Sequence, residues 1–368
     1  MPVLAGIGNS TMTVPLVRQL KRAFPAAKLT IAARTKPIGE VFSRLAEVDE
    51  LLFLGPDAKS AAATHREIRR RRADVYVVPH PSARWQYKLL AATSRARWTV
   101  VHRYPSGHVR GAGFLPMRRT VRIDADRGLH DTIQLVRMMS AFGVEPDERE
   151  PPHFPLRDED HQKADELLTR LGVARNDAFA AIMPGCAKTV LGSQKRWPPD
   201  RFARVVESLH HEHDLRSVVV EGPDEQGLGQ EVVDQVRAGP ARDGAVVAEL
   251  RGSLGITAAL LQRARLYVGN DSALSHLAAA VGTVPVTIFG AGDPVRGHPF
   301  GYRDLVVQPH EGWKTPLLYP FDSPYPKLRD DGVLWVQKIS VEAVLEAVER
   351  AFTFEPVLPR ELEAGRPG

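Results

Sequence analysis

Short apolar runs alternate along the chain with segments that have the apolar spacing of helices. In the first half, the expected strands are Val3–Ile7, Lys28–Ala33, Glu50–Leu54, Ala73–Val78 and Trp98–His102, and the expected helices are Val14–Phe24, Ile38–Leu45 and Ala61–Arg71. Strands that alternate with helices predict a parallel sheet with right-handed crossovers. The first half therefore has the pattern of an α/β domain.

A segment with three prolines, Glu148–Asp158, separates this series from a second one, because it can continue neither a helix nor an inner strand. The second series has expected strands at Phe179–Met183, Ser217–Glu221, Val246–Ala248, Leu266–Val268 and Val284–Phe289, and expected helices at Asp160–Leu171, Pro199–His211, Gly229–Ala238, Thr257–Arg263, Ala273–Val281 and Val341–Phe352. We predict two Rossmann-like, doubly wound α/β domains, residues 1–155 and 156–345, followed by a helix end and tail, 346–368. A length of 368 residues also favours two domains.

The stretch Leu266–Gly301 predicts an anion-binding helix start. Asp271 or Ser272 stands where a helix N-cap belongs, so N–H groups without intrahelical partners lie at the positive end of the helix dipole. Such helix ends bind phosphates. His276 lies one turn inside the same helix. The loop Gly290–Pro294 follows the next strand, at the sheet edge where ligands of parallel α/β sheets bind.

Charge is distributed unevenly between the two halves. Residues 1–150 contain 25 Lys and Arg against 14 Asp and Glu, a balance of +11, while the remainder contains 24 against 30, a balance of −6. A basic half suits an anionic membrane surface, a phosphorylated acceptor or nucleic acid. The alternative is that these arginines only cover a solvated face.

Composition favours an ordinary globular protein, with 43% hydrophobic and 25% charged residues. The chain has no apolar run long enough to predict a transmembrane helix, and its start lacks the pattern of a secretory signal. The single cysteine, Cys186, excludes an internal disulfide and suits a reducing compartment. We therefore expect a cytoplasmic location.

Several motifs occur in an order that is specific in combination. They are the N-terminal glycine turn with Pro15, Arg22-Ala23-Phe24-Pro25, Pro184-Gly185, Lys195-Arg196-Trp197-Pro198, Glu221-Gly222-Pro223-Asp224-Glu225 and the stretch Leu266–Gly301. Over about residues 4–350 the chain resembles glycosyltransferase family 9, the ADP-heptose:lipopolysaccharide heptosyltransferases. This resemblance implies the GT-B fold, in which two Rossmann-like domains face each other across a cleft. It also implies an inverting, metal-independent transfer of a sugar, with no cofactor beyond a nucleotide-sugar co-substrate such as ADP-heptose.

The resemblance implies a donor site in the C-terminal domain. Lys195 would bind phosphate and Glu225 would accept hydrogen bonds from the ribose hydroxyls. Without a metal, the charge of the departing diphosphate must be matched by helix N–H groups and cations. The predicted donor-binding residues are Lys188, Thr189, Lys195, Glu225, Asp271, Ser272, Ala273, Leu274 and His276. The alternatives are solvated charges in turns, a helix cap and a core histidine.

Asn9 stands where the family has an aspartate that acts as general base. An amide cannot take a proton from an acceptor hydroxyl at neutral pH. Either another base such as His80 or His102 substitutes, or the chain binds without catalysing, or the alignment shifts locally. We favour a substitute base or a changed acceptor. The predicted acceptor-binding residues are Gly8, Ser10 and Arg103.

The predicted function is sugar transfer, of a heptose by resemblance, to a hydroxyl of a glycan or glycolipid such as lipopolysaccharide core. The basic N-terminal domain would hold this anionic acceptor and contact the cytoplasmic face of the inner membrane peripherally, and we expect no nucleic-acid partner. One alternative is a soluble natural-product acceptor. Another, favoured by Asn9, is a catalytically impaired nucleotide-sugar-binding partner protein. The ordered set of motifs disfavours a sugar-nucleotide epimerase.

Two clusters have the residue types of metal sites but simpler explanations. Asp124-Ala125-Asp126 has the Asp-x-Asp form that holds a metal in the other main glycosyltransferase fold. It precedes a helix expected near Leu129, which favours a capping or loop role. The residues His210, His211, Glu212 and His213 lie at a helix end, where a solvated C-terminus is the preferred explanation. We therefore predict no metal site.

Overall fold

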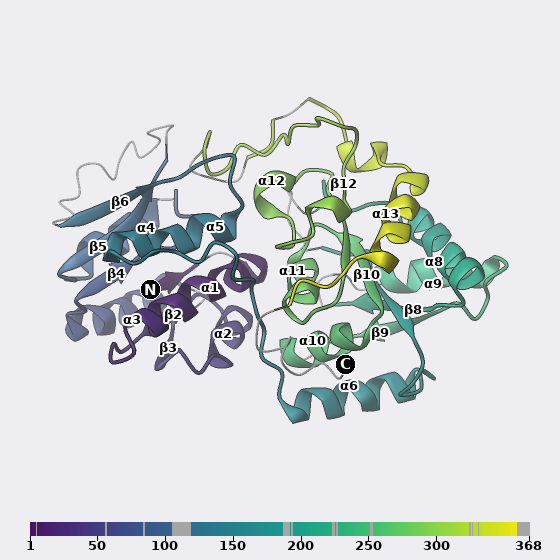
Figure 1. Ribbon diagram of the computed structural model, residues 1–368, viewed down its shortest axis with the longest axis horizontal. Coiled ribbons are helices and arrows are strands. Elements are labelled where there is room, and N and C mark those ends of the chain that lie inside the picture. Colours follow the sequence, from purple (N-terminus) through teal and green to yellow (C-terminus); the bar gives the residue numbers. More distant parts are fainter. Residues whose placement is uncertain are drawn as a thin grey trace. The chain divides into compact units, whose positions relative to one another are not determined.

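The computed structural model describes residues 1–4, 6–55, 57–83, 85–104, 119–186, 192, 194–222, 225, 227–250, 253–323, 325, 327–329 and 331–358. The chain forms two compact units (Figure 1). The first consists of Met1–Pro152 with Leu317–Lys327, and the second of His153–Pro316 with Leu328–Gly368. The segment Leu317–Lys327, which we had expected in the C-terminal domain, thus packs with the first unit.

Two parallel three-stranded sheets form the framework of the first unit. One has the order β1 (Pro2–Val3), β2 (Thr30–Ala33), β3 (Glu50–Phe53), and the other has the order β4 (Val75–Val77), β5 (Trp98–Arg103), β6 (Thr120–Asp124). Met1 and Leu4, which flank β1, pack against core clusters that contain β4 side chains. The ends of β1 therefore share core clusters with β4, a strand of the other sheet.

The helices of the first unit are α1 (Ile7–Ala23), α2 (Lys36–Ser43), α3 (Ala58–Arg71), α4 (Trp85–Thr93), α5 (Asp131–Val136) and the 3-10 helix η1 (Arg137–Phe142). The strand expected at Val3–Ile7 ends at Val3, and Ile7 already begins α1, so our prediction for this segment was wrong. Ser10 bonds to the Gly6 carbonyl through both its N–H and its hydroxyl, each at 3.0 Å, which closes the first helical turn. Pro15, expected in the first turn, lies in the middle of the helix.

A six-stranded parallel sheet forms the centre of the second unit. Its order is β12 (Val306–Val307), β11 (Pro285–Ile288), β10 (Leu266–Asn270), β7 (Phe179–Met183), β8 (Arg216–Glu221), β9 (Ala245–Glu249). The chain reverses its direction of travel across the sheet between β7 and β10. Gly269 pairs with Met183, so the carboxyl ends of these two strands are level. The five strands expected here all occur within two residues of their expected bounds.

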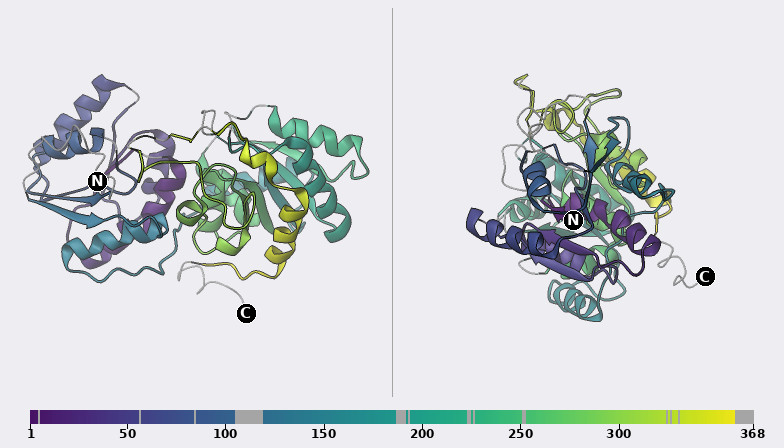
Figure 2. Two further views of the ribbon diagram at one scale, coloured as in Figure 1. Left: turned by 90° about the horizontal axis from the view of Figure 1, so that it is seen from above. Right: turned by 90° about the vertical axis from the view of Figure 1, so that its left-hand side faces the viewer.

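Helices cover both faces of this sheet (Figures 1 and 2). They are α6 (Asp158–Arg170), α8 (Pro199–His213), α9 (Leu228–Ala238), α10 (Leu254–Arg263), α11 (Ala273–Ala280), α12 (Pro294–Gly297) and α13 (Val341–Thr353), with the 3-10 helices η2 (Arg303–Leu305) and η3 (Trp335–Lys338). Apolar side chains of α8, α9 and α13 share one core cluster with the strands. Helix α10 contacts both α6 and α11. Within the described ranges, no helix has the length and apolarity to cross a bilayer.

Candidate functional site

The carboxyl ends of β7 and β10 lie side by side where the strand order of the second unit reverses. Asn270, the last residue of β10, is fully buried. Its Nδ2 donates to the Pro184 carbonyl at 2.8 Å, and its Oδ1 accepts from the Trp197 N–H at 3.0 Å. Asn270 thereby fixes the segment after β7 and the segment before α8 against the end of β10. Ligands of open α/β sheets bind at this position.

The segment Lys195-Arg196-Trp197 lies across this position. Lys195 Nζ is 2.5 Å from Asp271 Oδ2, and the lysine side chain is 18% exposed. Arg196 donates to the Cys186 carbonyl at 2.7 Å. The Trp197 side chain is buried. Because the two residues that follow it are anchored and its own Nζ pairs with Asp271, Lys195 presents a fixed positive charge at the carboxyl edge of the sheet.

Helix α11 begins directly beside this lysine. Ser272 is its N-cap but makes no side-chain capping bond, and the first turn contains no acidic residue. The N–H groups of Ala273 and Leu274 therefore lie at the positive end of the helix without an intrahelical partner. His276 follows within the helix and is 7% exposed. The helix start and Lys195 together form an electropositive site of the kind that binds phosphate.

Two glycines allow acidic side chains to approach the sheet edge closely. A Cβ at Gly292 would lie 1.9 Å from Asp271 Oδ2, and a Cβ at Gly185 would lie 2.1 Å from Glu225 Cγ. Asp271 therefore packs on the loop after β11, and Glu225 on the loop after β7. Burial raises the pKa of Tyr267, and the nearby carboxylates of Asp271 and Glu225 raise it further. The predicted residues Lys195, Asp271 and Glu225 thus gather at one edge of the sheet.

Glu221 and Glu225 belong to the same sequence motif, but Glu221 has a structural role. Its two carboxylate oxygens accept from the N–H groups of Gly227 and Gly229, each at 2.8 Å, so Glu221 caps the start of α9. Glu225 lies in the preceding turn and stays half-exposed. Lys188 and Thr189 lie outside the described residues.

A second polar cluster lies at the carboxyl ends of β4 and β5 in the first unit. His80 Nε2 is 2.9 Å from Asp131 Oδ1, and His80 Nδ1 is 3.0 Å from the Tyr104 hydroxyl. The Ser82 N–H donates to the same hydroxyl at 2.9 Å. All four residues are buried. Sequence reasoning had named His80 but missed Tyr104 and Asp131, because they are distant in sequence.

His102 lies beside this cluster, with its ring centroid 5.2 Å from that of His80. Its Nε2 is 3.0 Å from the Gln134 carbonyl, and its Nδ1 has no hydrogen-bond partner among the described residues. Burial, with a smaller effect of His80, lowers the pKa of His102 to about 3. A base this weak accepts a proton poorly near neutral pH.

The other predicted acceptor residues lie elsewhere in the first unit. Gly8, Asn9 and Ser10 form part of the first turn of α1, whose N-cap Gly6 offers no side chain. Arg103 instead pairs with Asp124 on the adjacent strand, with Nη2 and Oδ2 2.7 Å apart. This bond raises the pKa of Arg103 and lowers that of Asp124. In the Asp-x-Asp segment, Asp124 thus makes an ion pair and Asp126 caps a turn.

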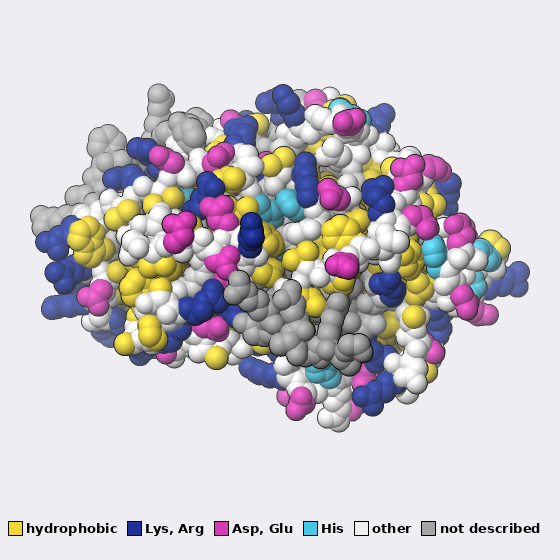
Figure 3. Space-filling view, in the orientation of Figure 1, with side chains coloured by type: hydrophobic (Ala, Val, Ile, Leu, Met, Phe, Trp, Pro, Cys, Tyr) yellow, Lys and Arg dark blue, Asp and Glu magenta, His cyan; other side chains and the backbone are white. Residues whose placement is uncertain are grey.

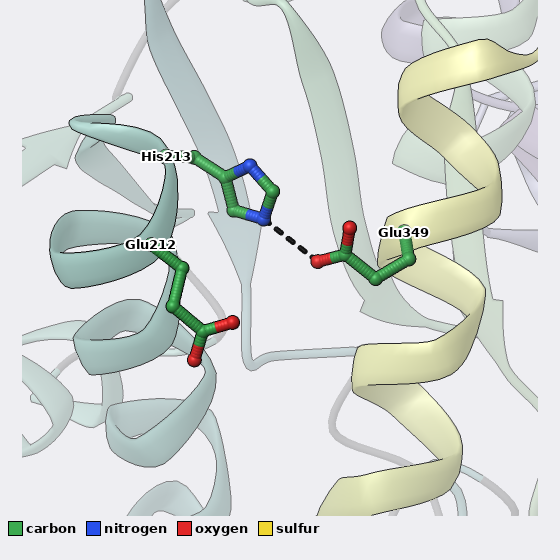
Figure 4. Close-up of side chains that lie close together, drawn as sticks. All are labelled: Glu212, His213 and Glu349. Carbon is green, nitrogen blue, oxygen red and sulfur yellow. Dashed lines mark hydrogen bonds and ion pairs between the residues drawn. The ribbon is translucent and has the colours of Figure 1, made fainter.

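At the end of α8, His213 contacts α13 (Figure 4). His213 Nε2 is 2.7 Å from Glu349 Oε1, and the ring stacks on Phe352 with centroids 4.1 Å apart. One ligand atom from each of Glu212, His213 and Glu349 lies within 4.8 Å of the others, a spacing that a metal ion would also require. An exposed hydrogen-bonded pair at a helix end explains this arrangement equally well.

The family model and the similar proteins that match this chain belong to the same family. The model of glycosyltransferase family 9 (heptosyltransferase) matches residues 91–318, more than half of the chain. Lipopolysaccharide heptosyltransferase 3 of Escherichia coli strain K12 is 26% identical over 328 residues, which cover 86% of this chain and 89% of that protein.

Two solved structures show the same fold. A family 9 glycosyl transferase from Veillonella parvula DSM 2008 superposes with a TM-score of 0.75 at 21% identity, over 96% of each chain. The E. coli heptosyltransferase WaaC with ADP-2-deoxy-2-fluoro heptose superposes with a TM-score of 0.62 at 17% identity, over 95% of this chain and 99% of that one. The predicted GT-B fold class and enzyme class are thereby confirmed. The chain belongs to glycosyltransferase family 9, the heptosyltransferases.

Proposed function

We propose that this glycosyltransferase moves a heptose from ADP-heptose to a hydroxyl of a lipopolysaccharide core. We choose ADP-heptose as the donor because the structure of one similar protein contains an ADP-heptose analogue. The choice of acceptor follows the relative named for lipopolysaccharide. A soluble natural-product acceptor is the alternative for the second choice.

The observation that carries this proposal is the position of Lys195 beside the uncapped start of α11. When the bond between the sugar and the diphosphate breaks, negative charge grows on the leaving oxygen. A fixed lysine and helix N–H groups stabilise that charge without reorganising. This arrangement supports a metal-independent reaction, in which the donor diphosphate lies against Lys195, Ala273 and Leu274, and the ribose lies near Glu225.

The acceptor belongs to the basic first unit in this proposal. An inverting transfer needs a base that removes the acceptor proton while the acceptor oxygen attacks the anomeric carbon. Figure 3 shows Lys and Arg side chains gathered at the left-hand end of the view, over this unit. Helix α3 ends in a run of arginines, of which Arg70 and the C-cap residue Arg72 are exposed. Such a surface favours a phosphorylated acceptor and a peripheral contact with an anionic membrane.

The test is ADP release by the purified full-length chain with ADP-heptose, measured with and without a phosphorylated lipopolysaccharide core. We expect release that depends on both substrates, and a product with the inverted anomeric configuration by NMR. A parallel assay with UDP-glucose in place of ADP-heptose tests whether the enzyme selects the nucleobase and the sugar of its donor. Transfer that is lost on adding a chelator and restored by a divalent metal would contradict the metal-independent mechanism.

Asn9 favours a second candidate, a nucleotide-sugar-binding partner without catalysis. Calorimetry separates the two. Tight binding of ADP-heptose with no turnover, across phosphorylated and unphosphorylated cores and soluble acceptors, would favour the binding function over the enzymatic one.

A further inference from the structure

We propose that Tyr104, His80 and Asp131 form a proton relay that replaces the carboxylate missing at position 9, with the Tyr104 hydroxyl in contact with the acceptor. The inference rests on the proposed transfer function. It assigns catalysis to Tyr104, and positioning and proton transfer to the two residues behind it.

The relay lies at the acceptor edge of the first unit. His80 follows β4 and Tyr104 follows β5, both at the carboxyl ends of their strands. Asp131 is the first residue of α5, and α5 packs along α1, whose first turn contains Asn9. Met1 and Leu4, which flank β1, pack in core clusters that contain β4 side chains. Ligands of parallel α/β sheets bind at the carboxyl ends of the strands.

The hydrogen bonds have one consistent direction. The Ser82 N–H can only donate, so the Tyr104 oxygen accepts from it and keeps a second lone pair. An ionised Asp131 accepts from His80 Nε2–H at 2.9 Å. His80 Nδ1 then lacks a proton and accepts from the Tyr104 O–H at 3.0 Å. The chain of donors therefore runs from tyrosine through histidine to aspartate, which is the direction that carries a proton away from an acceptor.

The inner members of the relay, His80 and Asp131, are shielded from water. His80 is 2% exposed and Asp131 is 5% exposed. The Phe321 ring, from the segment Leu317–Lys327, packs edge-on against Tyr104 with centroids 5.6 Å apart. In the same segment, Tyr319 donates to the Pro81 carbonyl at 3.2 Å. A buried carboxylate is costly to stability unless it is paired, and such costs are concentrated at functional sites.

In the transfer step, the acceptor oxygen forms its bond to the anomeric carbon while the bond to the diphosphate breaks, and the diphosphate leaves with the electron pair. The acceptor proton moves to Tyr104 as the tyrosine proton moves to His80 Nδ1. Asp131 stabilises the imidazolium that results, and the Ser82 N–H stabilises charge on the tyrosine oxygen. After product release, the proton returns to water by the reverse path.

The relay explains why Tyr104 needs His80. Burial raises the pKa of Tyr104, so a free tyrosinate is not formed near neutral pH. A concerted transfer through the neutral hydroxyl avoids that ion. Among the described residues, the titratable groups recorded around His80 are His102 of β5, Asp131 of α5, and Tyr104 with its neighbour Tyr319.

The experiment compares Tyr104→Phe with Tyr76→Phe in the full-length chain. Tyr76 is also a buried tyrosine of the first unit, and its hydroxyl has no hydrogen-bond partner among the described residues. We expect Tyr104→Phe to lower kcat roughly 10²–10⁴-fold, the usual contribution of acid–base catalysis, with an unchanged Kd for ADP-heptose. The kcat of Tyr76→Phe should stay within a factor of two of that of the unmodified chain, because a change that small is less than the loss of one hydrogen bond would cause.

Two further readouts separate a relay from a merely structural role. His80→Gln should lower kcat and flatten the acid side of the pH–kcat profile, because it removes the imidazole. Asp131→Asn should lower kcat but keep an acid side, because the imidazole is still present. Adding Asn9→Asp to Tyr104→Phe should restore a large part of the lost rate, because the family's carboxylate then takes the proton directly. A structural defect would not be rescued in this way.

The outcomes also separate the relay from the proposed function. If the parent transfers sugar and Tyr104→Phe is as active as Tyr76→Phe, the relay is wrong and the function stands. If the parent binds ADP-heptose but transfers nothing to any acceptor, both the transfer function and the relay are overturned. Loss of activity without rescue by Asn9→Asp, in a variant with normal melting temperature, also overturns the relay.

Discussion

Lys195 and Asp271 form an ion pair across the carboxyl ends of β7 and β10, with Nζ and Oδ2 2.5 Å apart. The aspartate is a carboxylate at a site that we assign to a diphosphate, so its charge opposes that ligand unless a cation offsets it. The lysine does this and keeps further donors for phosphate, because an ammonium group has three N–H bonds. The pair therefore holds the cation in place before the donor arrives.

Replacing Lys195 with Met should weaken binding of ADP-heptose roughly ten- to hundredfold. A hydrogen bond to a charged group is worth about 1.5–3 kcal/mol, and 1.4 kcal/mol corresponds to a factor of ten. Calorimetry on the purified chain measures the effect. Lys163→Met is the control, because Lys163 pairs with Glu159 on the exposed face of α6. An unchanged Kd in Lys195→Met would remove the donor assignment.

Gly292→Ala should disturb the same ion pair by steric contact alone. The new Cβ would lie 1.9 Å from Asp271 Oδ2, so the carboxylate must move away from its place beside Lys195. We expect donor affinity to fall roughly tenfold, comparable to the loss of one charge-assisted bond. Gly297→Ala is a matched control, since a Cβ there meets no atom within 4 Å. Equal affinities for the two alanine variants would show that the position of Asp271 does not govern donor binding.

The strands of the second unit could be predicted because each is a short apolar run between turn residues. Phe179–Met183, for example, is apolar at every position, as expected for a parallel strand covered on both faces. The first element of the chain could not be placed in this way. The apolar run Val3–Ile7 contains no polar N-cap, since Gly6 fills that position. Strand β12 and helix α12, of two and four residues, are too short to give a period.

Most of the residues that we assign to the donor could be selected from the sequence because they lie in short motifs. Lys195 and Asp271 are brought together by Asn270, which bonds to the backbone on both sides. The cluster in the first unit was predictable only in part. His80 follows a strand and could be noted, but its partners Tyr104 and Asp131 lie 24 and 51 residues further on. Spacing in the sequence carries no signal for contacts that depend on how three elements meet at a sheet edge.

His102 should make the first unit sensitive to acid. Its pKa falls from an ordinary 6.5 to about 3 in the folded chain, so the unfolded chain binds an extra proton between those values. The resulting stability is complete above about pH 6.5 and is lost as the pH falls towards 3, with a slope of up to about 1.4 kcal/mol per pH unit. Urea unfolding between pH 4.5 and 7.5 measures it.

His102→Gln should reduce that pH dependence by close to one proton, while it keeps an N–H that can reach the Gln134 carbonyl. His211→Gln is the control, because His211 is exposed at the end of α8. A pH dependence that His102→Gln leaves intact would assign the acid sensitivity to other groups.

Asn9→Asp should raise both the rate of transfer and the stability of the first unit. Asn9 occupies the third position of α1, and the first turn of this helix has no acidic residue. A carboxylate there interacts favourably with the helix dipole, by about 0.3–1 kcal/mol. It also supplies a base that an amide cannot provide, so kcat should rise by roughly tenfold or more if base catalysis limits the rate.

Asn9→Ser separates these two effects, since a hydroxyl neither carries the charge nor acts as a base. The measurements are kcat for transfer from ADP-heptose and the urea midpoint of the full-length chain. A stability gain without a rate gain would show that position 9 does not face the acceptor hydroxyl. A rate gain in Asn9→Asp but not in Asn9→Ser would show that the first turn of α1 keeps the geometry in which a carboxylate activates an acceptor.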